Sequence, residues 1–536
     1  MRLWHNRRQT LILAGAAFTN DGVPLTDSLL EAVADDPAEA IAWLFTHCWG
    51  SYFAIAFEEQ SLEAWIGRDP GGGLPANVID AGGVAIVTDQ LPRWLAAAVE
   101  RPTPVDQAAL ANALAMPLLA THRSLLHNVF HIPAGAALNW RARFGDCRQI
   151  WRPASSWSGG DHDPERMRQC VFAATRAWSC MHPNILVELS GGLDSAIVLG
   201  ALRSAGEGKT VAAINLATTY AGGDERELAR AVADRWDVEL VEFTARESEL
   251  DYEPTFEGPQ PLQPNLYGLD PLLEASVAGA AAAFGSDAIV SGQGGDAIFF
   301  QFPSEKVPID LMRASGPRAL FSDAAIDAAR RTRRSVWSIQ WLMVRDWIIG
   351  TQPDRMPPSL YPLTAKAKAL LDPAVADHPW LQDVTLLPPA KQTQILTIAN
   401  CQLFNGPTRR GGAATLRHPL MAQPVVEAWL AAPTYVLSTG TQDRAYARQL
   451  FADLLPSSIA RRRGKGETSI YYRRSLVENL DFLRDHLIGG TLVAHDLLDA
   501  ESLERLFDEQ VMLWNEEARL LPSLASLESW ARYWAL

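Results

Sequence analysis

The chain of 536 residues is longer than one ordinary hydrophobic core, and this length favours two to four domains. Hydrophobic residues make up 48% of it and charged residues 20%, which is the composition of a globular protein and not of a disordered one. The formal net charge of −15 argues against nucleic acid as a partner, because a phosphate backbone requires a basic surface.

The first residues imitate a signal peptide, with Arg2, Arg7 and Arg8 before an apolar run at residues 11–18. That run is short and a polar turn follows it at residues 19–22, so we interpret it as a buried strand that enters a hairpin. No stretch approaches the ~20 apolar residues of a membrane-spanning helix. Five cysteines without paired spacing are typical of reduced thiols. We therefore expect a cytoplasmic protein without a membrane partner.

Residues 1–152 are predicted to form an α+β domain. The β-prone runs are residues 52–57, 63–66, 84–88 and 136–140, and turn residues separate them. Residues 153–164 are rich in Ser, Gly and Asp, which predicts a linker to a second domain at residues 165–536.

The second domain begins with alternating strands and helices. Apolar strands are expected at residues 185–189, 211–217, 238–243 and 288–291, and helices at 196–202, 224–236 and 271–284. Alternation of this kind predicts a parallel sheet with helices on both faces, and therefore an α/β fold. Beyond about residue 300 helical faces dominate, for example Ala447, Leu450, Phe451 and Leu454. The last third is predicted to be largely helical.

The first strand runs into the loop Ser190-Gly191-Gly192-Leu193-Asp194-Ser195, and a buried helix follows. Ligands bind at this carboxyl end of strands in parallel sheets. The two glycines allow the backbone to approach a polyanion, the helix adds its positive end, and the serine hydroxyls can donate hydrogen bonds. Because the Gly-Lys-Ser/Thr ending of a Walker A loop is missing, transfer of a γ-phosphoryl group is disfavoured.

A second glycine-rich loop, Ser291-Gly292-Gln293-Gly294-Gly295-Asp296, follows the fourth strand. A carboxylate beside phosphates requires an intervening cation, so Asp194 and Asp296 are the expected ligands of Mg²⁺. The two loops are predicted to hold ATP through Ser190, Gly191, Gly192, Leu193, Asp194, Ser195, Ser291, Gly292, Gly294 and Gly295. The alternative is that both are ordinary glycine-rich turns with capping aspartates.

The first loop resembles the PP-loop of the ATP pyrophosphatases, and the order of motifs along the chain resembles the asparagine synthetase family. The further motifs are Arg68-Asp69-Pro70-Gly71 with Pro75, Asp224-Glu225, the second glycine loop, Leu416-Arg417-His418-Pro419-Leu420, and the basic stretch at residues 461–466. The resemblance implies a glutaminase-like (Ntn-type) first domain and an ATP-dependent, AMP-forming amide ligase. It also implies that adenine is read near Leu216, and that Asp194, Asp296 and Lys465 are catalytic, with Lys465 stabilising negative charge on the α-phosphate. A solvated basic run is the alternative for the region of Lys465.

Three positions depart from the family pattern. A glutamine-using member needs Cys as residue 2, and this chain has Arg2, so the first domain is expected to be a scaffold or docking surface. Ala297 follows Asp296 where the family has Glu, and Thr415 stands where the family has another Glu. We expect both changes to remove carboxylates around the site that receives the amine, as a larger, already nucleophilic amine would allow.

The three departures at Arg2, Ala297 and Thr415, together with residues 418–427, resemble the pattern of the lasso peptide cyclases. The resemblance implies that an Asp or Glu side chain of a precursor peptide is adenylated and joined to the peptide's own N-terminal amine as an isopeptide macrolactam. It also implies a leader-removing protease and a leader-recognition protein as partners. Three alternatives stay open: a small-molecule amide or β-lactam-type synthetase, an asparagine-synthetase-like enzyme that uses free ammonia, and a degenerate homologue that binds nucleotide or peptide without turnover.

Overall fold

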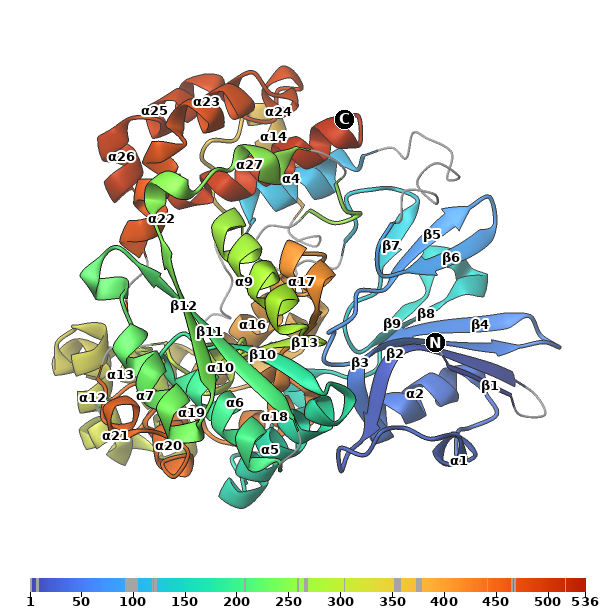
Figure 1. The fold of residues 1–536 in the computed structure, drawn as a ribbon, viewed down its shortest axis with the longest axis horizontal. Coiled ribbons are helices and arrows are strands. Elements are labelled where there is room, and N and C mark those ends of the chain that lie inside the picture. The colour runs from blue at the N-terminus through green and yellow to red at the C-terminus, as the bar shows by residue number, and fades with distance from the viewer. Residues whose placement is uncertain are drawn as a thin grey trace.

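The computed structural model describes the whole chain except residues 1, 6–8, 92–104, 118, 120–122, 207–208, 258–259, 265–268, 303, 351–357, 373–377, 441, 464–465, 467–468 and 516. Figure 1 shows the N-terminal strands on one side of the molecule, a parallel sheet with its helices on the other, and a group of C-terminal helices along the top.

The N-terminal region contains two antiparallel sheets. The larger has the order β1-β2-β3-β4-β8-β9 and the smaller has the order β6-β5-β7. Their bounds are β1 (Arg2–His5), β2 (Gln9–Thr19), β3 (Cys48–Glu58), β4 (Glu63–Arg68), β5 (Asn77–Ala81), β6 (Val84–Thr88), β7 (Val129–His131), β8 (Ala136–Asn139) and β9 (Cys147–Gln149). The apolar run at residues 11–18 lies within β2 and pairs with β3, which confirms its interpretation as a buried strand.

Two apolar cores flank the larger sheet, because successive side chains of a strand point to opposite faces. One face packs against α2 (Pro37–His47), which follows the short α1 (Asp27–Leu30), and buries Ile41, Leu44 and Phe45. The other face packs toward the smaller sheet through Ile66 and Val78. The first region is therefore antiparallel β-structure with helices, as predicted.

The second region is built on a parallel sheet of the order β12-β11-β10-β13-β14. Its strands are β10 (Asn184–Glu188), β11 (Thr210–Thr218), β12 (Glu239–Ala245), β13 (Ala288–Ser291) and β14 (Thr415–Arg417). The four predicted strands are confirmed, and β14 was not predicted. It has only three residues, too few for an apolar period to stand out in the sequence.

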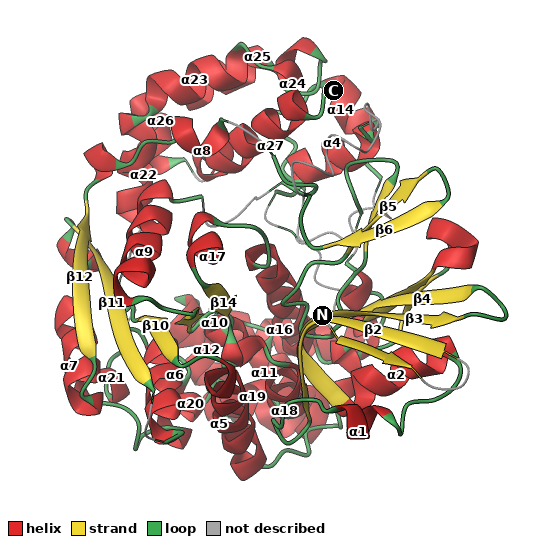
Figure 2. Cartoon of the chain, turned by 45° about the vertical axis from the view of Figure 1, so that its right-hand side comes forward, coloured by secondary structure: helices red, strands yellow, loops and turns green. Residues whose placement is uncertain are grey.

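Helices cover both faces of this sheet. Ile185 and Val187 of β10 point to the core shared with α5 (Pro164–Met181), α6 (Leu193–Ser204) and α7 (Arg226–Trp236). Leu186 between them points to the opposite core, which contains Val277 of α9 (Pro271–Phe284). Figure 2 shows these helices on the two sides of the strands.

The rest of the chain is largely helical, as predicted. The remaining helices are α4 (Gln107–Ala115), α8 (Glu253–Phe256), α10 (Gly295–Ile298), α11 (Val307–Ser315), α12 (Asp323–Thr332), α13 (Val336–Ile349), α14 (Ala365–Ala369), α16 (Pro389–Asn400), α17 (Arg409–Ala413), α18 (Gln423–Ala431), α19 (Thr434–Leu437), α20 (Ala445–Leu450), α21 (Ser457–Ala460), α22 (Ser469–Glu478), α23 (Leu480–Ile488), α24 (Thr491–Ala494), α25 (Ala500–Leu506), α26 (Glu509–Trp514) and α27 (Leu521–Tyr533). Within the described ranges, no helix is both long and apolar enough to cross a membrane.

The N-terminal region shares its core with the rest of the chain. Phe18 is fully buried, and its ring centroid lies 4.9 Å from those of both Trp49 and Trp178. The indole of Trp380 donates to the carbonyl oxygen of Ala134 at 3.0 Å. The predicted division at residues 153–164 stays a prediction, but the two sides of it are in extensive contact.

Candidate functional site

The first glycine-rich loop connects the carboxyl end of β10 to the first turn of α6, whose N-cap is Gly192. The hydroxyl of Ser190 lies 3.1 Å from that of Ser195 and accepts a hydrogen bond from the N–H of Gly192 at 3.2 Å. Gly191 has a φ of +80°, and a Cβ there would lie 2.7 Å from the carbonyl oxygen of Glu225. Glycine is therefore required at this position by both backbone conformation and space.

The second glycine-rich loop lies directly against the first. Their parent strands β10 and β13 are neighbours, with Glu188 paired to Ser291. A Cβ on Gly292 would lie 2.5 Å from the backbone nitrogen of Ser195, and a Cβ on Gly295 would collide with the carboxyl carbon of Asp194. The structure thus brings the two predicted loops together, while the binding of ATP by them stays a prediction.

The carboxylates of Asp194 and Asp296 meet at one guanidinium group. Nη1 of Arg444 lies 2.6 Å from Oδ2 of Asp194 and 2.6 Å from Oδ1 of Asp296, and Nη2 lies 2.8 Å from Asp443. Arg444 is only 2% exposed. Burial disfavours its charge, but the three aspartates more than offset this and raise the pKa of Arg444 above its ordinary value. The sequence predicted a cation between these two aspartates and did not identify Arg444.

The pair Asp194 and Asp296 fits a magnesium ion whose other ligands are phosphate oxygens and water. Within the described ranges, no group of three or more His, Cys, Asp or Glu side chains converges as a metal site would require. Mg²⁺ is commonly held by one or two carboxylates together with phosphate oxygens and water. Two carboxylates that reach the same nitrogen of Arg444 are close enough to share such an ion, so Asp194 and Asp296 are the residues that could hold it.

A buried charged cluster lies beside the loops at the end of β10. Arg410 of α17 forms ion pairs with Glu188 and, through Nε at 3.0 Å, with Glu274. His418 follows β14, and its Nδ1 lies 2.8 Å from the hydroxyl of Ser291. Burial and the cations Arg410 and Arg417 lower the pKa of His418 to about 3. His418 is therefore neutral near pH 7 and orients the serine that starts the second loop.

The basic stretch at residues 461–466 is tied to the first loop through Glu225. Oε1 of Glu225 accepts from Arg462 at 2.5 Å and from the N–H of Gly466 at 2.6 Å. The carbonyl of the same Glu225 packs on Gly191. Gly464 and Lys465 lie outside the described residues, so the predicted role of Lys465 has no structural test here.

Leu216 lies on β11, the strand next to β10, and is half-buried. It stands two residues beyond Ile214, which pairs with Glu188 at the end of β10. Leu216 therefore lies beside the first loop. The recognition of adenine near Leu216 stays a prediction.

The structure locates two of the departures from the family pattern. Ala297 lies in α10 directly after Asp296. Thr415 is exposed and pairs with Ala288 at the amino end of β14, about 10 Å of strand length before Ser291. That both changes remove carboxylates around the site that receives the amine stays a prediction.

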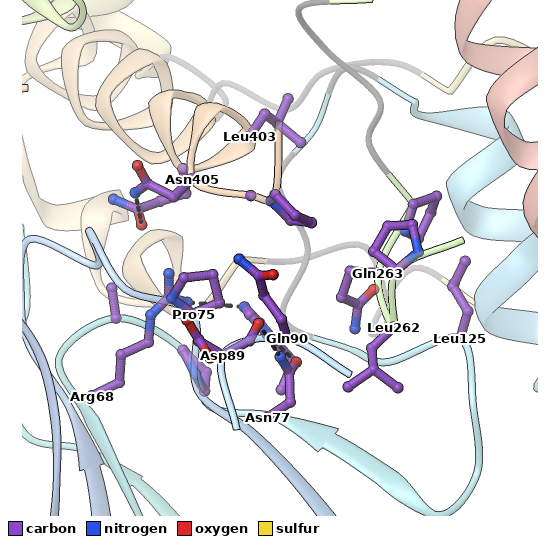
Figure 3. A pocket seen from close by; sticks show the side chains of 18 of the residues that line it. Arg68, Pro75, Asn77, Asp89, Gln90, Leu125, Leu262, Gln263, Leu403 and Asn405 are labelled. Atoms are coloured by element: carbon purple, nitrogen blue, oxygen red, sulfur yellow. Dashed lines mark hydrogen bonds between the residues drawn. The ribbon is translucent and has the colours of Figure 1, made fainter. Parts of the chain in front are cut away.

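A cavity of about 360 Å³ lies between the N-terminal domain and the loop at residues 402–407. No residue of the two glycine-rich loops lines it. Figure 3 shows carboxamide side chains around it, among them Asn77, Gln90, Gln263 and Asn405. Arg68 also lines the cavity and is held by His131 at 2.9 Å. The cavity is large enough for a small molecule or a few peptide residues.

Met421 connects this cavity's wall to the second loop. A Cβ on Gly294 would collide with the side chain of Met421, and Gly71 packs against the Met421 carbonyl. Gln402, which lines the cavity, donates to the carbonyl oxygen of Gly71 at 3.2 Å. Gly71 and Met421 therefore link the cavity wall to the second glycine-rich loop.

Comparison with known proteins agrees with this arrangement. The sequence profile of the asparagine synthase family matches residues 181–532, which include both glycine-rich loops, Arg444 and the basic stretch. A comparison with curated protein sequences gave no match. With two thirds of its length matched, this chain belongs to the asparagine synthase family.

Proposed function

We propose that this chain is a lasso-peptide-type macrocyclase, which joins an Asp or Glu side chain of a precursor peptide to the peptide's N-terminal amine and releases AMP and pyrophosphate. Membership in the asparagine synthase family supports ATP-dependent amide-bond synthesis in general. The finer assignment depends on where the amine comes from.

The observation that carries the proposal is that the cysteines of the N-terminal sheets, Cys48 and Cys147, are not reactive thiols, because burial raises the pKa of each to about 12. Residue 2, in β1, is Arg, and the nearest cysteine along the chain is Cys48. Cys48 is 1% exposed, and burial raises the pKa of its thiol to about 12. A buried neutral thiol cannot replace the N-terminal cysteine of a glutaminase. The amine must therefore arrive by another route, and a substrate that carries its own amine provides one.

The carboxamide-lined cavity supports a substrate larger than ammonia. Its carboxamides, including Gln90 and Gln263, can pair with the N–H and C=O groups of a peptide backbone. Ala297 next to Asp296 leaves the neighbouring position without charge. Both features suit a peptide that is held close to the ATP-binding loops.

In this proposal the two glycine-rich loops hold the phosphates of ATP while the substrate carboxylate attacks the α-phosphorus. Asp194 and Asp296 would hold Mg²⁺, which when bound neutralises charge on the departing pyrophosphate. Arg444 lies against both aspartates and would add positive charge beside them. The peptide amine then attacks the acyl carbon and AMP leaves. This step is favoured because both groups belong to one held peptide.

In this proposal Lys465 stabilises the negative charge of the second step. The reaction takes place in the cytoplasm, beside a leader-removing protease and a leader-recognition protein. A small-molecule amide or β-lactam-type synthetase is the second candidate, because a cavity of about 360 Å³ also accepts a small acid.

The direct test is incubation of the purified chain with ATP, Mg²⁺ and a leaderless peptide encoded beside its gene. The expected product has lost the mass of one water, and AMP and pyrophosphate appear in equal amounts with it. Pyrophosphate release only with small acids or with free ammonia would move the assignment to those substrates. ADP in place of AMP, or binding without turnover, would refute the proposal.

Asp194→Asn provides the residue-level test. We expect AMP formation to fall at least a hundredfold, because the substitution removes one of two carboxylates at the proposed diphosphate site while keeping its shape. Asp443→Asn is the matched control, since Asp443 pairs with the same Arg444 but lies outside both loops. Both variants should keep the wild-type circular dichroism spectrum. Equal activity losses in the two variants would contradict the assignment of Asp194.

A further inference from the structure

Arg444 stands where a cation shared by Asp194 and Asp296 would stand. Its Nη1 lies 2.6 Å from Oδ2 of Asp194 and 2.6 Å from Oδ1 of Asp296. A Mg²⁺ ion binds carboxylate oxygens at about 2.0–2.1 Å, so it cannot bind these two oxygens while the guanidinium nitrogen lies against both. The charge of the guanidinium also repels a second cation at the other oxygens of the same carboxylates. Arg444 and a metal ion therefore compete for the aspartate pair.

The backbone around Arg444 holds its side chain in this position. Arg444 is the N-cap of α20 and has a left-handed conformation, with φ of +50° and ψ of +37°. Such a conformation persists in a residue other than glycine only where the surrounding structure fixes it. The side chain of Gln442 donates to the carbonyl oxygens of Ala460 and Arg462, at 2.9 and 2.7 Å, and so ties the segment to the basic stretch. The contact of Arg444 with the aspartates is thus built into the fold.

The charges around this guanidinium balance, so a bare metal ion gains little by entering. Arg448 pairs with Asp443 at 3.0 Å, and Arg331 interacts with the charge of the same carboxylate. The three aspartates of the site thus face three guanidinium groups. A divalent ion that displaced Arg444 would leave this buried side chain with Asp443 alone, and a buried charge that loses its partners is strongly disfavoured.

We infer that Arg444 is the resident cation of this site, which excludes free Mg²⁺ from Asp194 and Asp296 until a nucleotide binds. The inference rests on the proposed function, in which these two aspartates hold the metal. Phosphate oxygens are partners that a guanidinium pairs with as well as it pairs with carboxylates. Arg444 can therefore give up the two aspartates when phosphates are present, and only then. The metal enters together with the nucleotide and not before it, so Arg444 is a positioning residue that sets the order of binding.

The test is metal binding by the nucleotide-free chain, with Mn²⁺ as the probe because it suits the same carboxylate ligands. Electron paramagnetic resonance measures the Mn²⁺ that stays free in solution. Arg444→Gln should bind Mn²⁺ roughly tenfold more tightly than the wild type or better, because two buried carboxylates lose their cation. Adding Asp194→Asn to Arg444→Gln should remove the gained site. A residue with only a structural role would lower the melting temperature but would not create a metal site.

Two variants serve as matched controls. Arg448→Gln removes a guanidinium that pairs with Asp443 but leaves Arg444 against Asp194 and Asp296. Arg444→Lys keeps a cation at the position itself. Both should bind Mn²⁺ as weakly as the wild type. Equal Mn²⁺ affinity of the wild type and Arg444→Gln overturns the inference, as does a gain in Arg448→Gln of the same size.

Melting temperatures give a second measurement that needs no Arg444 variant. Mg²⁺ alone should leave the melting temperature of the wild type unchanged, whereas Mg²⁺ with a non-hydrolysable ATP analogue should raise it. Stabilisation of the wild type by Mg²⁺ alone, lost in Asp194→Asn, overturns the inference even if Arg444→Gln does not fold. Neither measurement involves turnover, so a failure here leaves the peptide assignment intact. AMP formation by Asp194→Asn tests the metal assignment separately.

Discussion

Arg444 is the residue around which the ligand-free site is organised. It is buried and neutralises Asp194 of α6 and Asp296 of α10, as well as its neighbour Asp443. Two adjacent carboxylates without a cation would repel each other, so the guanidinium keeps the site assembled before any ligand binds. The sequence contains Arg444 in an unremarkable Asp-Arg pair, and only the fold shows that it faces the two loops.

His418 predicts a measurable pH dependence of stability. Its pKa is about 3 in the folded chain and near 6.5 when unfolded, so between these values only the unfolded state binds the proton. The free energy of unfolding should therefore fall as the pH drops below about 6.5, by on the order of 2 kcal/mol at pH 5. Urea unfolding at both pH values should show a smaller fall for His418→Gln, which keeps a hydrogen-bonding group near Ser291. Identical falls would contradict the buried neutral imidazole.

At the scale of elements, the unit of β10, the first loop and α6 contacts the unit of β13, the second loop and α10. The glycines of the second loop make this contact. Gly292 and Gly295 pack directly on Asp194 and Ser195, so the second loop can lie against the first only without side chains. Neighbouring parallel strands bring the loops to one edge, and the glycines set how closely they approach. The proposed phosphate site depends on this contact.

Gly292→Ala tests that contact. The new methyl group would lie 2.5 Å from the backbone nitrogen of Ser195, so the loops must separate. We expect ATP affinity, measured by calorimetry, to fall at least tenfold and the melting temperature to drop. The control is Gly279→Ala in α9, where no atom lies within 4 Å of the new methyl group and where alanine should stabilise the helix by about 0.5–1 kcal/mol. Unchanged ATP binding by Gly292→Ala would show that the loops do not hold the phosphates together.

At the scale of the whole molecule, the N-terminal sheets and the family domain share one core. Phe18 of β2 and Trp49 of β3 pack on Trp178 of α5, and Trp151 packs on Trp380. The N-terminal domain also supplies one wall of the cavity. In the proposed function it is therefore a structural part of the substrate site.

Phe18→Ala should therefore destabilise the entire chain. Phe18 is fully buried, and truncation of such a residue costs about 3–5 kcal/mol. Calorimetry should show one transition at a lower temperature, with both regions melting together. Leu386→Ala, at a side chain that is 92% exposed, is the control and should melt as the wild type does. Two transitions, of which only one moves, would show that the regions fold independently.

Much of the fold was predictable from local patterns. The strands β10, β11 and β13 carry continuous apolar runs, β12 carries apolar residues around Glu242, and the helices between them have clear amphipathic or buried faces. The three-residue β14 was missed because it is shorter than any apolar period, so the sequence did not show that Thr415 pairs with Ala288 at the amino end of that strand. Sequence order cannot show at which end of a strand a residue lies when the strand itself is not recognised.

The sequence by itself determined the two glycine-rich loops and their aspartates, because each depends on residue type and on neighbours along the chain. Only the tertiary structure decided that Arg444 lies between the aspartates, that the N-terminal domain completes a cavity, and that α13 has an outward apolar face. These features join residues hundreds of positions apart, or depend on which face of a helix is covered. Side-chain packing in three dimensions, and not local pattern, decides such contacts.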